Sequence, residues 1–319
     1  MAARSAAWRR MPPAVFPAVL GLLGLGLAWR RAQLAYGAAL PIGEVLLGAG
    51  VALLVVAGLT YLAKIVVRPG VLREDLRVLP GRAGTAAMTL SAMLAATALV
   101  PYAPGFAGAL VAGALIAHAG LAALVAHAIA SGPAEGRVVT PVWHLVFVGF
   151  ILAAPVLAAL GRGEAAQAVL LATMPVAAVI YAISLWQLAR GQLPPPPLRP
   201  VLAIHLAPAS LFASVAAMLG MGILAAFWAG LGAAVLAGLL LSGRWLLAAG
   251  VTPLWGALSF PLAAYASVLI IASGGAGAFG IVAGVMLVAV TLLVLAILAL
   301  VLRGWVSGDL AARTNAAEA

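Results

Sequence analysis

The sequence predicts an all-α membrane protein, and three observations support this prediction. Hydrophobic residues make up 66% of the 319 residues and charged residues only 8%, with a mean hydropathy of +1.22. Ten apolar segments are long enough to cross a bilayer as helices, which takes about 20 residues each. The basic residues gather in alternate connections between these segments. A water-soluble domain could not bury so much apolar surface, so lipid is the expected solvent.

The predicted spans follow one another with short connections, as a single membrane domain over residues 1–319. The first span could be mistaken for a secretion signal, since Arg9 and Arg10 precede it. However, Trp29-Arg30-Arg31 follows it in place of a small-residue cleavage site, so we interpret it as a retained helix. The ten predicted helices cover residues 13–29, 43–67, 84–102, 105–131, 140–161, 164–189, 200–220, 222–241, 253–272 and 275–303.

The basic residues predict the orientation of the chain. Connections after the odd-numbered spans hold only Arg30, Arg31 and Arg162. The other 14 of the 17 lysines and arginines lie in the N-terminal segment, in the connections after the even-numbered spans, or in the C-terminal tail. Positively charged connections stay on the cytoplasmic side of a membrane. We therefore expect a multi-pass protein of the inner (plasma) membrane with both termini in the cytoplasm.

Prolines distinguish two sets of spans. Four of the five odd-numbered spans contain or begin with proline, and those expected to kink helices at a pore are Pro17, Pro155, Pro208 and Pro261. The third span, expected to start at Gly84, has none, and the even-numbered spans share one, Pro175. Lipid tolerates the carbonyl that a proline frees only where protein or a water-filled cavity satisfies it. The pattern predicts five helical hairpins around a central pore, with the odd-numbered helices inside.

The chain lacks the groups that most enzymes and metal sites use. It has no cysteine, and its seven carboxylates are expected at helix ends or in loops, away from any acid–base pair or proton relay. His118 and His127 are nine positions apart and so lie on opposite helix faces. The letters GAGAFG at 275–280 match a dinucleotide fingerprint but lack the preceding strand and the downstream acid. We expect no enzyme activity, no cofactor, no metal and no bound nucleic acid.

Two other histidines, His144 and His205, lie near the cytoplasmic starts of the fifth and seventh spans. They could share a site, but no carboxylate is adjacent to either, and a capped or pore-facing neutral histidine is the favoured interpretation. Acids inside a passage would repel anions. Their absence from the spans, together with arginines at the cytoplasmic mouth, favours passive anion flow.

Four stretches carry a family resemblance: MPPAVFPAVLGLLGLGLAWR at 11–30, PVWHLVFVGF at 141–150, PPPLRPVLAIHLAPAS at 195–210 and WGALSFPLAA at 255–264. They resemble the tellurite-resistance/dicarboxylate transporter (TDT) family, which includes TehA-like proteins and the plant slow anion channels. The resemblance spans essentially the whole chain. It implies a homotrimer with one pore per protomer, closed by a phenylalanine on the ninth helix. Phe260 matches that position, although Leu258 stands where the family has an aromatic residue.

The expected function is a passive, phenylalanine-gated anion channel for small inorganic anions or carboxylates, with a family link to tellurite resistance. The alternative is a proton-coupled transporter of C4-dicarboxylates or tellurite. A break of the ninth helix at Pro261 would aim the Phe260 ring across the passage, whereas the competing interpretation is that this ring only packs between helices. Further candidates for lining the pore are Phe16, His144, Phe147, His205 and Phe212.

Overall fold

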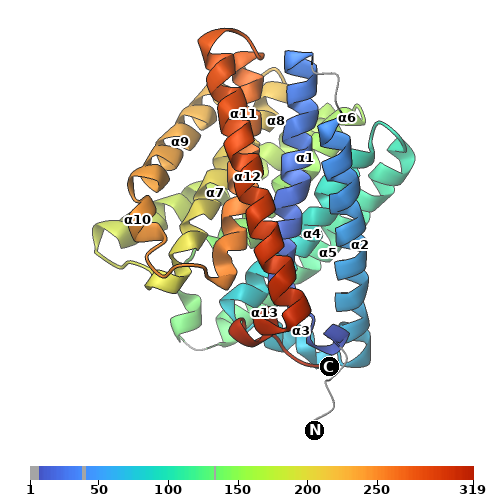
Figure 1. The fold of residues 1–319 in the computed structure, drawn as a ribbon, viewed down its shortest axis with the longest axis vertical. Helices are drawn as coiled ribbons and strands as arrows, with labels where there is room; N and C mark the ends of the chain where they lie inside the picture. The colour runs from blue at the N-terminus through green and yellow to red at the C-terminus, as the bar shows by residue number, and fades with distance from the viewer. Residues whose placement is uncertain (1–6, 38–40, 133) are drawn as a thin grey trace.

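The computed structural model describes residues 7–37, 41–132 and 134–319, which form helices joined by short connections and contain no strand (Figure 1). The element η4 is a π-helix and the other η elements are 3₁₀-helices. In chain order the elements are η1 (Ala7–Arg10), η2 (Pro13–Val15), α1 (Phe16–Tyr36), α2 (Ile42–Val67), α3 (Gly70–Asp75), α4 (Leu79–Leu99), α5 (Pro104–Ser131), η3 (Ala134–Arg137), η4 (His144–Val148), η5 (Gly149–Ala153), α6 (Ala154–Ala159), α7 (Gly163–Ala189), η6 (Pro196–His205), α8 (Leu206–Met218), α9 (Gly222–Leu241), α10 (Gly243–Leu246), η7 (Pro253–Trp255), α11 (Gly256–Ser273), α12 (Gly277–Ser307) and α13 (Asp309–Arg313).

Eight helical stretches among the described residues are long and apolar enough to cross a membrane. They coincide with eight of the predicted spans. The third and fifth predicted spans correspond to α4 and to the shorter apolar stretch His144–Ala159, which fall outside that set. The prediction of an all-α membrane protein is confirmed, while the count of ten crossings stays a prediction.

Burial separates the helices into two layers. In the most apolar windows of Pro13–Tyr36, Pro196–Met218 and Pro253–Ser273, between 72% and 78% of the residues are buried. The corresponding shares for α2, α5, α7, α9 and α12 lie between 11% and 28%. Many exposed side chains of this second set are large and apolar, as at Ile223 and Leu241 on α9. Such helices suit a lipid environment, so the second set forms an outer layer around the first.

The inner elements form a closed ring. Along it, α1 packs against α4 and α11, α11 packs against α8, α8 packs against η5 and α6, and these two in turn pack against α4. Each outer helix packs against the inner element that precedes it in the chain: α2 against α1, α5 against α4, α7 against α6, α9 against α8, and α12 against α11 (Figure 1). These are the contacts that five consecutive hairpins would make.

Three of the four prolines expected at a pore lie where an inner segment changes from another helix type to α-helix. Pro17 and Pro155 are the second residues of α1 and α6, and Pro208 is the third residue of α8. The N–H groups of a first helical turn have no partner inside the helix, so proline costs little there. Pro261 differs, because α11 continues through it without interruption. The ninth helix therefore does not end at Pro261, and a kink at this residue stays a prediction.

Two predicted helix ends also need correction. The first span continues as α1 to Tyr36, so Arg30 and Arg31 lie within a helix and not in a connection. The third begins at Leu79, upstream of Gly84. A Cβ at Gly84 would lie 2.2 Å from the carbonyl oxygen of Pro13, so this glycine permits close packing of α4 against η2.

One carboxylate, Asp75, lies at a helix end as predicted, and it is fully buried there. Asp75 Oδ2 lies 3.1 Å from Lys64 Nζ, and neither side chain is exposed. Tyr61 donates to the same oxygen at 2.9 Å, and the backbone N–H of Ala317 donates to the other carboxylate oxygen at 2.8 Å. This cluster ties the C-terminal residues to α2 and α3, at the lower end of the molecule in Figure 1.

Candidate functional site

The first turns of the five inner segments enclose a small cavity of about 20 Å³. Each of the five inner segments contributes to its wall, for example through Ala14, Ala83, Leu145, Val201 and Leu254. These side chains are all apolar, and the space holds about one water molecule. A hydrophobic constriction of this kind opposes ions by exclusion and dewetting. The described structure is therefore closed at this level of the ring.

Phe260 lies on α11 at the contact with α1, and it is only 4% exposed. A Cβ at Gly24 would lie 2.8 Å from Cδ2 of Phe260, and a Cβ at Gly21 would lie 2.2 Å from Oγ of Ser259. Two glycines thus allow α1 to approach this turn of α11 closely. Phe260, the residue predicted to be the gate, thus lies on an inner helix, and its buried phenyl group packs against Gly24.

Ser259 connects the same two helices through a neutral hydrogen bond. Its Oγ lies 2.6 Å from the carbonyl oxygen of Gly256 and 3.1 Å from that of Pro17, so its hydrogen can reach either carbonyl. Pro261 has no N–H to donate to the carbonyl of Ala257, a residue that lines the central cavity. The polar groups beside the constriction are therefore a hydroxyl and backbone carbonyls, without a charged side chain among them.

Three phenylalanines named as pore-lining candidates have other neighbours. The Phe16 ring is 6.0 Å from the Tyr61 ring of the outer helix α2. The Phe212 ring is 4.7 Å from the Trp228 ring of the outer helix α9. Phe147 packs against Trp143, with 5.4 Å between ring centroids. Phe16 and Phe212 therefore contact the outer layer.

His144 and His205 are brought together, as the sequence allowed. Nε2 of His144 lies 3.0 Å from Nδ1 of His205, and the hydroxyl of Tyr181 donates to the backbone carbonyl of His205. The other ring nitrogen of His144 is buried and has no partner in the described structure. No set of three metal-ligating side chains occurs among the described residues. The two histidines form a hydrogen-bonded link between η4 and η6.

Arg31 is the residue of interest that the sequence reasoning missed. Its neighbour Arg30 makes two hydrogen bonds to the Glu44 carboxylate, at 2.6 and 2.7 Å, which compensates its charge. Arg31 instead donates to Oγ of Ser214 on α8 at 3.4 Å, and no carboxylate of the described chain lies within 4 Å of it.

The path of the Arg31 side chain follows from the order of the inner ring. In the ring, α11 lies between α1 and α8, and α12 packs on both α11 and α1 from the outer layer. A side chain that reaches from α1 to α8 therefore crosses the inner side of α11. Arg31 is seven residues after Gly24 on α1, which places it about 10 Å beyond the Phe260 contact along the helix axis.

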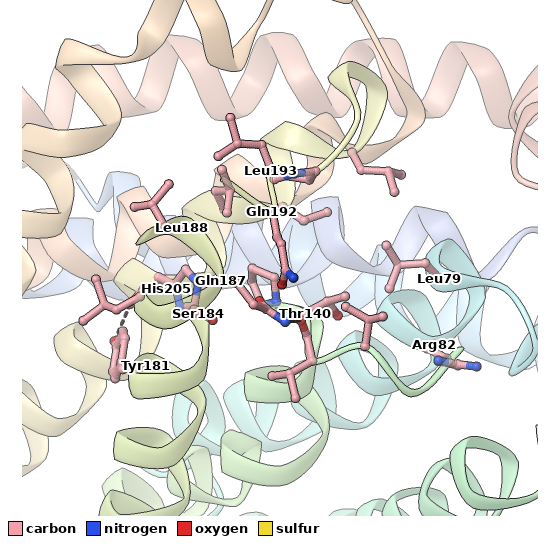
Figure 2. Close-up of a pocket in the computed structure, with 18 of the residues that line it drawn as sticks. Leu79, Arg82, Thr140, Tyr181, Ser184, Gln187, Leu188, Gln192, Leu193 and His205 are labelled. Carbon is pink, nitrogen blue, oxygen red and sulfur yellow. Dashed lines mark hydrogen bonds between the residues drawn. The ribbon is translucent and has the colours of Figure 1, made fainter. Parts of the chain in front are cut away.

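A much larger cleft, of about 2150 Å³, lies beside the ring. Residues of the outer helices α7 and α9 and of η6 line it. Figure 2 shows Thr140, Ser184, Gln187 and Gln192 gathered in the middle of this cleft, with Tyr181 and His205 on one side and Arg82 on the other. The cleft is separate from the central constriction, but Val201 lines both.

A closed inner ring surrounded by apolar outer helices defines an integral membrane protein built around a central passage. Residues 10–302 match the family model SLAC1, described as a voltage-dependent anion channel. The match covers most of the chain, and the protein therefore belongs to this family. No curated protein matches the chain. Membership confirms the predicted family resemblance, supports a general function in anion transport across a membrane, and agrees with a role other than that of an enzyme.

Proposed function

We propose that the protein is a passive anion channel whose passage is closed by Phe260 and the apolar constriction beside it. The observation that carries this proposal is the position of the Phe260 side chain. It is buried among the inner helices against Gly24, next to a cavity that holds about one water molecule. Its substrates are small inorganic anions or carboxylates.

Charge within the ring supports anions as the permeating ions. Arg31 has no carboxylate partner in the described chain, whereas the buried acid Asp75 is paired with Lys64. An uncompensated cation in a membrane helix is costly and is characteristic of a binding or conduction site. Arg31 attracts anions toward the passage at the end opposite the chain termini.

The alternative is a proton-coupled transporter of C4-dicarboxylates or tellurite, and the His144–His205 pair is the observation that favours it. Histidine is a side chain suited to carrying a proton at physiological pH. Under this alternative, the anion flux would follow an imposed pH gradient at zero voltage. Replacing both histidines by glutamine would abolish that dependence.

The proposal includes the assembly and location expected from the family resemblance and the charge pattern. The protein forms a homotrimer with one passage in each protomer. It spans the inner (plasma) membrane several times, with both termini in the cytoplasm. A role in tellurite resistance remains part of the proposal only as a consequence of anion flux.

The test is voltage-clamp recording of the purified protein in planar bilayers, with chloride, nitrate and malate as probes. A passive channel gives a current that follows voltage and reverses near the anion equilibrium potential. We expect Phe260→Ala to raise this current, because the ring that fills the passage is removed.

The matched control is Phe212→Ala, which removes a buried ring that packs against the outer layer. Deleting a buried phenylalanine costs about 3–5 kcal/mol in soluble cores. Both variants should therefore lose stability, but only Phe260→Ala should gain current. A Phe260→Ala variant with unchanged current per protein would show that the ring only packs between helices.

A further inference from the structure

The large cleft is bordered by α7 and α9 and lies beside the small central cavity. Residues of both outer helices line it, and both helices pack against α8. On α9 the lining extends from Phe227 to Leu239, which is about 18 Å along a helix axis. The side chains along this stretch include Leu231 and Val235. This part of the cleft matches the length of one half of a bilayer core, about 15 Å.

Polar groups occupy the middle of the cleft. The hydroxyl oxygens of Thr140 and Ser184 are buried and have no hydrogen-bond partner in the described structure. Gln187 and Gln192 lie beside them, and Gln187 donates to the backbone carbonyl of Val139 at 3.2 Å. A buried hydroxyl without a partner costs free energy. A ligand that brings oxygen atoms to this level would remove that cost, whereas a pure hydrocarbon would not.

Three arginines line the cleft, and Figure 2 shows one of them, Arg82, on the side away from Tyr181 and His205. Arg73 and Arg77 are exposed, and Arg82 is half-buried, with Nε donating to the carbonyl of Leu76 at 2.6 Å. No carboxylate of the described chain lies within 4 Å of these three guanidinium groups. Guanidinium groups in this position suit a phosphate, which they can bind through paired hydrogen bonds.

We propose that this cleft binds one anionic phospholipid. One of its two acyl chains lies along α9 between Phe227 and Leu239, its ester oxygens meet Thr140 and Ser184, and its phosphate meets the arginines. The order of apolar wall, hydroxyls and cations is the order of groups along a phospholipid. An inserted segment from a second copy of this chain would leave the arginines facing a largely apolar surface.

The bound lipid would act on the passage through η6. A 3₁₀-helix of ten residues is unusually long, and such stretches often mark hinges. Val201 of η6 lines both the cleft and the central cavity, and His205 joins η6 to η4 of the inner ring. Occupancy of the cleft therefore alters the shape of the constriction. This second step rests on the proposed channel function, whereas lipid binding does not.

The binding test uses the full-length protein in mild detergent with phosphatidylglycerol or phosphatidylcholine of identical acyl chains, read by native mass spectrometry. We expect one phosphatidylglycerol per chain and weaker binding of phosphatidylcholine. Replacing Arg73 and Arg77 by glutamine should weaken retention about fivefold for each charge removed. Arg303→Gln is the control, because Arg303 is an exposed cation on α12 that does not line the cleft.

A second pair of variants tests the apolar wall. Val235→Trp fills the cleft and should abolish retention of the lipid, whereas Leu241→Trp, at a 90% exposed position on the same helix, should not. Equal retention of both lipids, or retention unchanged by Val235→Trp, would overturn the lipid site. Because the chain has no cysteine, a Val235→Cys variant contains a single thiol, and oxidation can link it only to the same thiol of a second copy. A disulfide-linked dimer would show that a second copy covers the cleft, and so would overturn the proposal.

The effect on the passage has its own readout. Anion flux in liposomes should differ between phosphatidylglycerol and phosphatidylcholine for the unmodified chain, and Val235→Trp should remove this difference. If the lipid binds but flux is equal in both lipids, the coupling through η6 is wrong. If the lipid binds and no lipid supports flux, the channel proposal fails while the lipid site stands.

Discussion

Replacing Arg31 by glutamine tests the electrostatic part of the proposed mechanism. The substitution removes one positive charge from the inner side of the ring and keeps a polar side chain that can donate hydrogen bonds, although it is too short to reach Ser214 as Arg31 does. We expect anion conductance to fall and the preference for anions over cations to weaken. Arg31→Lys keeps the charge and should retain most of the conductance.

The size of this effect follows from the distance at which an anion could meet the guanidinium. At about 4 Å, two unit charges interact by about 1 kcal/mol in bulk water and by about 4 kcal/mol at an effective dielectric constant of about 20. A narrow passage lies between these limits. The smaller value corresponds to a change of about fivefold in the occupancy of the site. We therefore expect at least about a fivefold fall in conductance at low chloride concentration, with a smaller effect at high ionic strength.

The matched control removes the neighbouring charge together with its partner. Arg30→Gln combined with Glu44→Gln leaves the net charge unchanged, because Arg30 and Glu44 form an ion pair. The assay is voltage-clamp recording at several chloride concentrations, with protein amount measured in parallel. The reasoning is refuted if Arg31→Gln conducts like the unmodified protein, or if the double variant loses conductance to the same extent.

Three further predictions concern packing, stability and topology. Gly24→Ala places a Cβ 2.8 Å from the Phe260 side chain, so it should lower the stability by about 1–3 kcal/mol. In a Phe260→Ala background the same substitution should cost much less. If thermal unfolding shows the same loss of stability in both backgrounds, the contact between Gly24 and Phe260 is contradicted. Lys64→Met leaves the Asp75 carboxylate buried and unpaired, which should cost about 3–5 kcal/mol. Adding Asp75→Asn should recover part of that loss, and no recovery would count against the ion pair. A reporter fused after Ala319 should lie in the cytoplasm, and an external reporter would overturn the predicted orientation.

The layers of the fold could be predicted because lipid restricts what a helix can contain. Prolines are tolerated in membrane helices where neighbouring protein surrounds them, and the stretches that begin at Pro13, Pro196 and Pro253 are the well-buried ones. The outer layer holds fewer prolines within its helices, namely Pro104 at the start of α5 and Pro175 inside α7. The outer helices α2 and α9 are apolar over most of their surface, as a lipid-facing helix must be. Composition and proline position thus carry information about the layer of each helix.

Helix ends and helix types could not be predicted in the same way. The hydropathy of the sequence predicts that the first span ends near Trp29, because two arginines follow. In the structure α1 continues to Tyr36. The fifth span reads as one apolar stretch, but the structure divides it into π, 3₁₀ and α elements before and after Pro155. Both outcomes depend on tertiary contacts, and a single-sequence pattern contains no such contacts.

The charges illustrate how much of the site depends on these contacts. In the sequence, Lys64, Arg30 and Arg31 are equivalent basic residues near the ends of apolar segments. In the structure, Lys64 meets a buried carboxylate from α3, and Arg30 meets the carboxylate of Glu44. Arg31 meets only a serine hydroxyl across the ring. An ion pair presents little net charge to a passing ion, whereas an isolated guanidinium presents a full one. In the proposed channel, attraction of anions at this point therefore depends on Arg31, the one of these three cations that lacks an acidic partner among the described residues.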